Sequence, residues 1–375
     1  MQGSLTKKGK YWYVVVDLGK DENGKRNQKW HNTKQEDKKE AQKVQREILT
    51  SLDKGMYVEP AKKSFSEFIL EWLEDDIKVN REGTTYESYK QTINKHIVPY
   101  FRNIQLQSLQ PIQLQKFYKY LLDKGLSANT VKHHHANIHK CLKYALRLGL
   151  VNRNAAEAVE LPKVEKYQAK YYNGKEIDKL LKAVKGSYVE VPVTITIAMG
   201  LRRGETLGLK WENVNLETGE LFVLNNRVRK GKEKILKKTK TEKSRRMLSM
   251  PNYLIGYLKQ LQLKQKQNKE WFFGDTYNDE GYVCCLKDGN PLGITYVSRM
   301  FKQVLENNEL PAIRFHDLRH SNASYLLKQG VSMKELQEWL GHSSMSTTAD
   351  IYAHVDAEMK RNIAKKSNNM FKNVK

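Results

Sequence analysis

The sequence predicts a multidomain protein with a small β-rich part (a three-stranded sheet plus a helix), an all-α part, and a mostly helical part of mixed α and β structure. Its 375 residues exceed what one ordinary hydrophobic core supports. Strand patterns dominate the start of the chain, whereas helical periodicity prevails from Ser64 onward. Short linkers, Gly55–Lys63 and Leu161–Ala169, separate the parts. We therefore expect domains at residues 1–60, 64–158 and 167–375.

The charge composition favours a polyanion as partner. Lysine and arginine number 66 against 42 acidic residues, which gives a formal net charge of +24. A membrane surface is the competing polyanion, but the sequence has no apolar run of about eighteen residues and no signal-peptide core. The cysteines Cys141, Cys284 and Cys285 form no disulfide framework, which fits a reducing compartment. We expect a soluble protein of the cytoplasm, without membrane contact.

The first part is expected to be a sheet followed by a helix. Lys10–Asp17 is rich in aromatic and β-branched residues and predicts a strand. Asn23 and Gly24 form a hairpin turn signal, and Gln28–Thr33 predicts a further strand. Lys38–Leu52 predicts the helix.

A basic sheet with exposed aromatic side chains can lie in the major groove of DNA. The alternative is a small sheet with a solvated, charged rim. If the sheet binds DNA, the candidate contact residues are Tyr13, Lys25, Arg26, Lys29 and Trp30.

The second part is predicted to contain four helices. They begin at Ser64 or Ser66, at Thr84, at Pro111 and at Ser127. The run His133–His135 suggests a metal site, but consecutive residues point in different directions on a helix, and no zinc site is expected. A basic helix face on DNA or plain exposure to solvent are the remaining interpretations.

The third part begins with helical patterns at Asn173 and at Val191–Met199, of which the second is apolar and leads into Arg202. Strand patterns at Leu221–Asn225 and Met247–Met250 flank a very basic segment. Further helices are expected at Tyr253–Lys266 and Ile294–Leu305.

Near the C-terminus, polar residues interrupt the helical pattern at each helix end. His316 and Arg319 precede a helix that ends at Gly330. Ser332 and Glu335 then form a capping box that opens a short helix, which Gly341 ends, and His342 is expected to lie exposed on the turn. Tyr352 follows a Ser/Thr-rich segment.

These residue types suit chemistry on a phosphodiester. Arginine offers a planar fork that matches two phosphate oxygens, and histidine supplies a donor or a proton near neutral pH. Tyrosine can act as a covalent nucleophile. Taken singly, each residue could be structural: a buried histidine, a surface arginine, a core tyrosine. The ordered set H-x-x-R, L-G-H, Y-x-H indicates a site.

The segments HDLRHSNAS, LGHSS and IYAH resemble the C-terminal signature of the tyrosine recombinases, or phage-type integrases. Upstream, AMGLRRGE is similar to the family's first arginine box, with Arg202 in the catalytic place and Glu205 as its acidic companion. KTEKSRR resembles the family's hairpin lysine motif, K-T-x-x-S-x-R, with Lys240. The sequence departs from the family at Met199, where many members have threonine, and Lys238 and Lys243 compete with Lys240.

The resemblance implies an arm-binding N-terminal domain, a SAM-like core-binding domain and a tyrosine-recombinase catalytic domain. It implies that Tyr352 attacks DNA to form a 3′-phosphotyrosyl bond, without metal, ATP or other cofactor. Arg202 and Arg319 would bind the non-bridging oxygens, and Lys240 would protonate the leaving 5′-oxygen. His316 would act as acid or base, His342 would donate a hydrogen bond, and Glu205 would orient its neighbours.

The resemblance also implies partners. They are double-stranded DNA at core sites and arm sites, three further copies in a homotetramer, and an accessory excision factor. The tail residues Met370 and Phe371 are candidate anchors on a neighbouring protomer. The group of closest resemblance is that of conjugative transposons, whose integrases insert and excise a mobile element, and phage integrases share the layout. The protein would then be associated with a bacterial nucleoid.

Two other functions remain open at this point. A catalytically silent DNA-binding protein would keep the fold, and a type IB topoisomerase shares the chemistry. No carboxylate cluster suited to two metal ions is recognisable, which argues against a D-D-E transposase.

Overall fold

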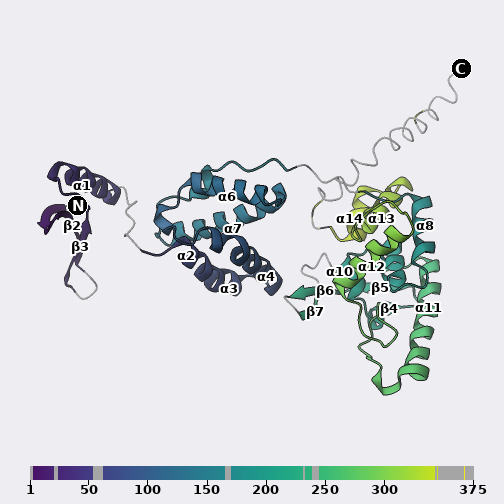
Figure 1. Ribbon diagram of the computed structural model, residues 1–375. Coiled ribbons are helices and arrows are strands. Elements are labelled where there is room, and N and C mark those ends of the chain that lie inside the picture. Colours follow the sequence, from purple (N-terminus) through teal and green to yellow (C-terminus); the bar gives the residue numbers. More distant parts are fainter. Residues whose placement is uncertain are drawn as a thin grey trace. The chain divides into compact units, whose positions relative to one another are not determined.

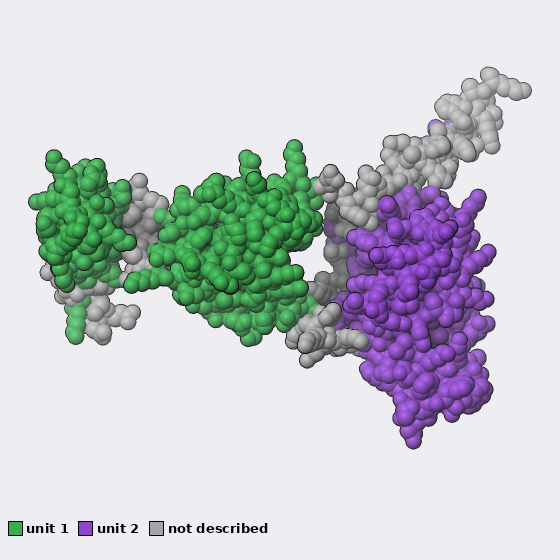
Figure 2. Space-filling view, in the orientation of Figure 1, with its two compact units in different colours: residues 1–165 green, residues 166–375 purple. Residues whose placement is uncertain are grey.

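The computed structural model describes residues 3–20, 24–53, 62–164, 170–230, 233–238, 245–342, 344 and 367. The chain separates into two compact units, residues 1–165 and 166–375 (Figure 2). Among the described residues, no helix is both long and apolar enough to cross a membrane.

The first unit begins with the expected three-stranded sheet and helix (Figure 1). The strands β1 (Gly3–Lys8), β2 (Tyr11–Lys20) and β3 (Arg26–Asn32) pair antiparallel in the order β1-β2-β3. The helix α1 (Lys38–Asp53) packs on β1 and β2.

The two faces of this sheet differ in character. Val14 and Val16 are buried, and the paired Gly3 lies close to Leu49 of α1, so this face is the one that the helix covers. Successive residues of a strand point to opposite faces. Val15 pairs with Trp30 on the other face, where 52% of Trp30 is exposed.

A helical part follows within the same unit. Its elements in chain order are α2 (Phe65–Trp72), the π-helical η1 (Leu73–Ile77), α3 (Lys78–Asn80), α4 (Gly83–Thr92), the π-helical η2 (Ile93–Ile97), α5 (Val98–Tyr100), the 3₁₀ turn η3 (Leu106–Ser108), α6 (Pro111–Asp123), α7 (Ala128–Arg147) and the 3₁₀ turn η4 (Ala155–Ala158). Of the two serines proposed as first cap, Ser64 is the one used, in a capping box with Glu67.

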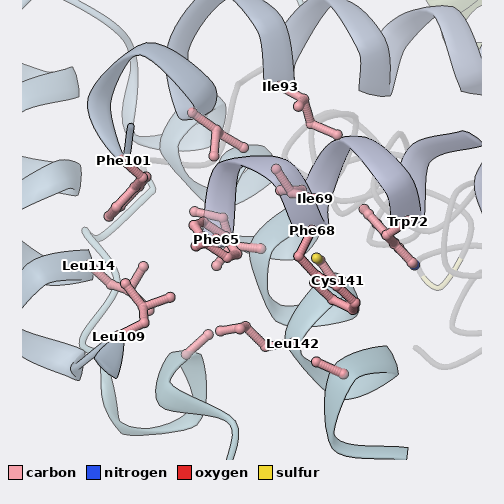
Figure 3. Packing of buried hydrophobic residues seen from close by; sticks show 14 of the residues in the cluster. Phe65, Phe68, Ile69, Trp72, Ile93, Phe101, Leu109, Leu114, Cys141 and Leu142 are labelled. Carbon is pink, nitrogen blue, oxygen red and sulfur yellow. The ribbon is translucent and has the colours of Figure 1, made fainter. Parts of the chain in front are cut away.

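Aromatic rings form the centre of the helical part's core. Phe101 lies edge-on to Phe65 and to Phe117, with ring centroids 5.3 and 4.9 Å apart. Figure 3 shows Phe65 and Phe101 together with other members of this cluster, among them Leu114 and the buried Cys141. In the run 133–135 the central His134 is buried, and His135 contacts the hydroxyl of Tyr118, so the three rings do not converge.

The second unit is mostly helical with two small sheets. Its elements are α8 (Gly174–Val184), α9 (Glu190–Met199), α10 (Arg203–Leu207), η5 (Trp211–Asn213), β4 (Val214–Asn215), β5 (Glu220–Val223), β6 (Asn225–Lys230), β7 (Glu233–Lys238), β8 (Arg246–Ser249), α11 (Asn252–Gln267), η7 (Asn268–Phe273), η8 (Gly274–Thr276), α12 (Ile294–Asn307), α13 (Asp317–Lys328) and α14 (Met333–Leu340). One sheet has the order β4-β5-β8, and β6 and β7 form a hairpin.

The apolar helix α9 is the centre of this unit. It packs against α8, α10, α11 and α13, and its residues Val193, Ile195 and Met199 are buried. A helix that is apolar on all sides is buried on all sides. Its C-terminal end therefore lies deep in the unit, and this buried end fixes the position of the residues that follow it.

Candidate active site

The turn after α9 places an arginine and a carboxylate together. Gly200 ends the helix in the left-handed conformation, with φ of +64°. Arg202 is the N-cap of α10, and Glu205 accepts hydrogen bonds from its backbone N–H at 2.9 Å and from its Nη1 at 2.7 Å. The arginine box of the sequence is thus a local capping arrangement.

Two further arginines join this pair from distant parts of the chain. Arg246 Nη2 donates to Glu205 Oε2 at 3.1 Å, and Arg319 Nη1 lies 4.0 Å from the same oxygen. We call Arg202, Arg246 and Arg319 the arginine cluster. Burial alone would raise the pKa of Glu205, but the charges and hydrogen bonds of Arg246 and Arg202 hold it below the ordinary value. One carboxylate therefore faces three cations.

The arginine cluster also binds the C-terminal end of α14. Arg246 Nε donates to the carbonyl of Trp339 at 2.8 Å, Arg319 Nη2 to that of Leu340 at 2.7 Å, and Arg202 Nη2 to that of Gly341 at 2.8 Å. The last carbonyls of a helix have no intrahelical partner and carry the negative end of its dipole. Three consecutive carbonyls thus fix three guanidinium groups.

His342 is buried, with 8% exposed, so the expectation that it lies exposed on the turn was wrong. Its backbone N–H donates to the carbonyl of Gln337, and the Gln337 side chain donates to the His342 carbonyl, which folds the turn back onto the helix. Burial, followed by the charges of Arg319 and Arg202, lowers the pKa of His342 to about 3. The imidazole is neutral at pH 7.

His316 precedes α13 and remains exposed. Its ring lies edge-on to that of His320, with centroids 5.4 Å apart. Loss of solvation, then the charges of His320 and Arg319, holds the pKa of His316 below its ordinary value, although the exposed edge of the ring limits this effect. His316 is therefore also neutral at pH 7.

A cavity of about 750 Å³ adjoins these groups. Arg202 and His316 line it together with Arg203, Arg314 and apolar side chains of α12. The side chain of Arg202 is 33% exposed, whereas that of Arg319 is 2% exposed. Within the arginine cluster, Arg202 is more exposed than Arg319, and it faces the same space as His316.

Five of the predicted site residues thus lie in one region: Arg202, Glu205, His316, Arg319 and His342. Lys240 and Tyr352 lie outside the described residues, as do Lys243, Met370 and Phe371. Lys238 is in β7, but its side chain is not among those described.

The proposed DNA contacts in the sheet do not share one face. Tyr13 and Trp30 are in ring contact, with centroids 6.4 Å apart, on the face away from α1. Lys29 pairs with Val16 and points to the other face. Lys25 is exposed before β3, and the Arg26 side chain is not among those described.

Two site residues were not predicted. Arg246 is the last residue of the K-T-x-x-S-x-R match, where it received no role, and it is a member of the arginine cluster. Asn322 of α13 donates from Nδ2 to the carbonyls of Ile197 (2.8 Å) and Ala198 (3.3 Å), and so caps the end of α9. Only Arg246 had a signal in the sequence.

Comparisons with known proteins agree with this geometry. Residues 170–359 match the model of the phage integrase family, and residues 64–122 match that of the phage integrase N-terminal SAM-like domain. A tyrosine recombinase XerC-like protein of Caldanaerobacter subterraneus subsp. tengcongensis is 30% identical over 98% of both chains. The ICEBs1 integrase of Bacillus subtilis is 26% identical over 77% of this chain and 78% of that protein.

Two solved structures share the fold. The Tn1549 transposon integrase in complex with a circular intermediate DNA matches with a TM-score of 0.69 at 15% identity, over 81% of this chain and 99% of that one. A lambda integrase tetramer bound to a Holliday junction matches with a TM-score of 0.59 at 18% identity, over 92% and 94%. The expected SAM-like and tyrosine-recombinase folds are confirmed.

The end of α9 gives a test of the packing behind the site. Gly200→Ala and Gly330→Ala both place a side chain at positive φ, which costs about 1–2 kcal/mol. At Gly200 the new Cβ would also lie 2.6 Å from Asn322 Oδ1 and 2.7 Å from Leu340 Cδ2, whereas at Gly330 nothing lies within 4 Å. We expect Gly200→Ala to lower the free energy of unfolding clearly more than Gly330→Ala. Urea unfolding, followed by hydrogen exchange in α13, measures the difference, and equal losses would contradict it.

The neutral His342 predicts a pH dependence of stability. The unfolded chain binds a proton near the ordinary pKa of 6.5, but the folded chain does so only near its pKa of about 3. Between these values the free energy of unfolding falls by up to about 1.4 kcal/mol per pH unit as the pH is lowered. In His342→Asn the decline from about pH 6.5 to about pH 4 should be shallower, as measured by hydrogen exchange of α14. His133→Asn, at an exposed position of α7, is the control. Parallel curves for His342→Asn and wild type would exclude this cause.

Proposed function

The chain belongs to the phage integrase family of tyrosine recombinases, and from this premise we propose how its residues cut and rejoin DNA. The observation that carries the proposal is the arginine cluster. Three guanidinium groups share one buried carboxylate, so the site keeps an excess of positive charge beside an open cavity. A phosphodiester supplies the missing negative charge.

We propose that Tyr352 attacks the phosphorus in line. The bond from its oxygen to phosphorus forms as the bond to the 5′-oxygen breaks, which leaves a 3′-phosphotyrosyl link and a 5′-hydroxyl. Lys240 donates the proton that the 5′-oxygen takes up. Attack by the 5′-hydroxyl of a partner strand then reverses these steps. Because the bond energy is retained in the phosphotyrosine, the chemistry requires no ATP.

Arg202 and Arg319 have the role of stabilising charge on the non-bridging oxygens, since phosphoryl transfer relies mainly on positioning and electrostatics. Arg202 presents its guanidinium to the cavity. Arg319 uses two of its five N–H groups on the carbonyls of Gly200 and Leu340, which fixes its plane. Glu205 orients Arg202, and we assign it no proton transfer, because its lowered pKa makes it a weak base and its oxygens accept hydrogen bonds from the arginines.

The histidines act as neutral groups. A neutral imidazole has one donor and one acceptor nitrogen. His342 donates to a non-bridging oxygen, and His316 accepts the phenolic proton of Tyr352. Their lowered pKa values support this assignment, because each ring is unprotonated before DNA binds. Negative charge that develops at the phosphate then favours proton uptake by His316.

The wider function is the integration and excision of a mobile element. Names of relatives support it: one is the ICEBs1 integrase, and a structural neighbour is the Tn1549 transposon integrase. The integrase of Staphylococcus phage L54a is 26% identical, so a phage is the alternative to a conjugative transposon as the mobile element. We further propose core-site and arm-site DNA as partners, an accessory excision factor, and action on the bacterial nucleoid.

A homotetramer is proposed for the assembly, supported by the lambda integrase tetramer on a Holliday junction. Arm-site binding is assigned to the uncovered face of the N-terminal sheet. There Trp30, which is 52% exposed, forms an aromatic pair with Tyr13, and Lys8 pairs with Tyr11. Aromatic groups beside lysines are suited to contact with a nucleic acid.

The nucleophile is tested by covalent trapping on a nicked DNA that carries the end of the element, in EDTA. We expect wild type to form a protease-sensitive adduct on the 3′-phosphate, and Tyr352→Phe to form none, because the phenolic oxygen is the attacking group. An adduct that persists in Tyr352→Phe, or one that requires Mg²⁺, would overturn the proposed mechanism. DNA binding without any wild-type adduct would favour the silent DNA-binding alternative, and relaxation of plasmids without the site would favour the topoisomerase.

Arg202→Lys tests the arginine cluster. It keeps the charge, but a lysine cannot donate to Glu205 and Gly341 and also offer a planar fork to phosphate. We expect a loss of about 10²–10³ in the single-turnover cleavage rate, the scale for losing one preorganised donor. Arg299→Lys, at an exposed arginine stacked on Tyr296, should leave the rate unchanged. Wild-type cleavage by Arg202→Lys would remove Arg202 from the site.

A further inference from the structure

We infer that Arg246 is a positioning residue that couples the basic hairpin to the phosphate-binding arginines. This inference rests on the proposed function and deepens it. The hairpin consists of β6 and β7, and β8 follows it in the sequence, beginning at Arg246. The segment between β7 and β8 contains Lys240. The first residue of the strand after this segment is thus a member of the arginine cluster.

The contacts of Arg246 connect three elements. It lies in β8 opposite Val223 of β5, its Nη2 donates to Glu205 of α10, and its Nε donates to Trp339 of α14. Its side chain is 8% exposed. Two donors of one rigid guanidinium plane therefore fix the distance between the acid of the arginine box and the helix that leads to His342.

The turn after α14 packs closely against the side chain of Arg246. A Cβ added at Gly341 would lie 3.0 Å from Arg246 Nη1 and 3.3 Å from its Cδ. The turn of the L-G-H motif therefore lies directly on Arg246. A lysine at this position would offer a single ammonium group and could not occupy both acceptors in the same geometry.

The first strand of the hairpin, β6, contacts the Arg202–Glu205 turn at Gly204. A Cβ added at Gly204 of α10 would lie 2.7 Å from the carbonyl of Arg227 in β6 and would also meet the side chain of Asn226. The backbone of β6 thus approaches α10 as closely as a glycine permits. The first strand of the hairpin, β6, and the strand that follows the hairpin, β8, thus both contact the Arg202–Glu205 turn, β6 through its backbone and β8 through Arg246.

Glu205 connects Arg246 to Arg202, the arginine that lines the cavity. Its Oε1 accepts from the side chain of Arg202, and its Oε2 accepts from the side chain of Arg246 and from the backbone N–H of Arg202. Without Arg246, the carboxylate of Glu205 would interact more strongly with Arg202 and draw its side chain away from the cavity. In addition, β8 would lose its hydrogen bonds to Glu205 and Trp339. We therefore expect Arg246 to affect the chemical step, with little effect on DNA affinity.

The experiment compares single-turnover adduct formation at saturating nicked DNA for wild type, Arg246→Gln and Arg246→Lys. Arg245→Gln is the matched control, because it removes one positive charge from an exposed neighbouring position. We expect both Arg246 variants to lose about 10- to 100-fold in rate, the scale for residues that orient a site from behind. Arg245→Gln should alter the salt dependence of DNA binding and leave the saturated rate close to wild type.

Two further readouts separate positioning from a general structural role. A methylphosphonate at the cleaved position removes the non-bridging charge that the arginines bind, so the loss in Arg246→Gln should shrink to within about threefold on this substrate. In the Glu205→Gln background, adding Arg246→Gln should cost less than it does in wild type, because both substitutions remove one shared interaction. Hydrogen exchange in α14 verifies that the variants are folded, and Arg246→Lys serves if Arg246→Gln is not.

Each result has a defined meaning. A wild-type rate in both Arg246 variants would overturn the inference and leave the proposed function intact. Equal losses on the phosphodiester and the methylphosphonate, with additive effects of the two substitutions, would assign Arg246 to fold stability alone. Failure of the wild-type protein itself to form an adduct would overturn the proposed function, and this outcome is visible before any variant is measured.

Discussion

The electrostatic problem at the centre of the second unit is that three guanidinium groups surround a single buried carboxylate. Two like charges 4 Å apart repel by roughly 4 kcal/mol at the effective dielectric of a protein. Glu205 offsets part of this repulsion, and three consecutive carbonyls at the end of α14 offset more. In the mechanism that we propose, an incoming phosphate neutralises the remaining positive charge.

This constraint accounts for much of the surrounding fold. The arginines can approach one carboxylate only if their backbones are held by elements that do not move apart. Arg202 follows the buried helix α9, Arg319 belongs to α13, which packs on α9, and Arg246 begins β8. Glycines occur where the backbone lies closest to side chains of the site: Gly200 beside Asn322, and Gly341 beside Arg246. The packing of these elements therefore determines the geometry of the arginine cluster.

The sequence predicts features that depend on local signals, but not those that depend on contacts between distant segments. Helix ends follow from local signals, so the caps at Ser332 and Gly341 were predicted correctly. The members of the site were found because motif residues carry chemistry that a core does not need. The burial of His342 and the position of Arg246 depend on contacts between residues far apart in the sequence, such as Arg246 with Trp339. The roles of Lys240 and Tyr352, and the three-domain boundaries, stay predictions.

The neutral histidines follow from the same electrostatics. Burial is the main cause of the lowered pKa of His316 and of His342, and the charges of the arginines lower both further, because a protonated imidazole would add a fourth cation to the arginine cluster. A neutral ring still donates one hydrogen bond, so it can bind a phosphate oxygen without adding to the repulsion before DNA arrives. In the mechanism that we propose, the negative charge of a bound phosphate favours protonation of a nearby histidine. Substrate binding would then raise the pKa of the histidine that accepts the proton of the nucleophile.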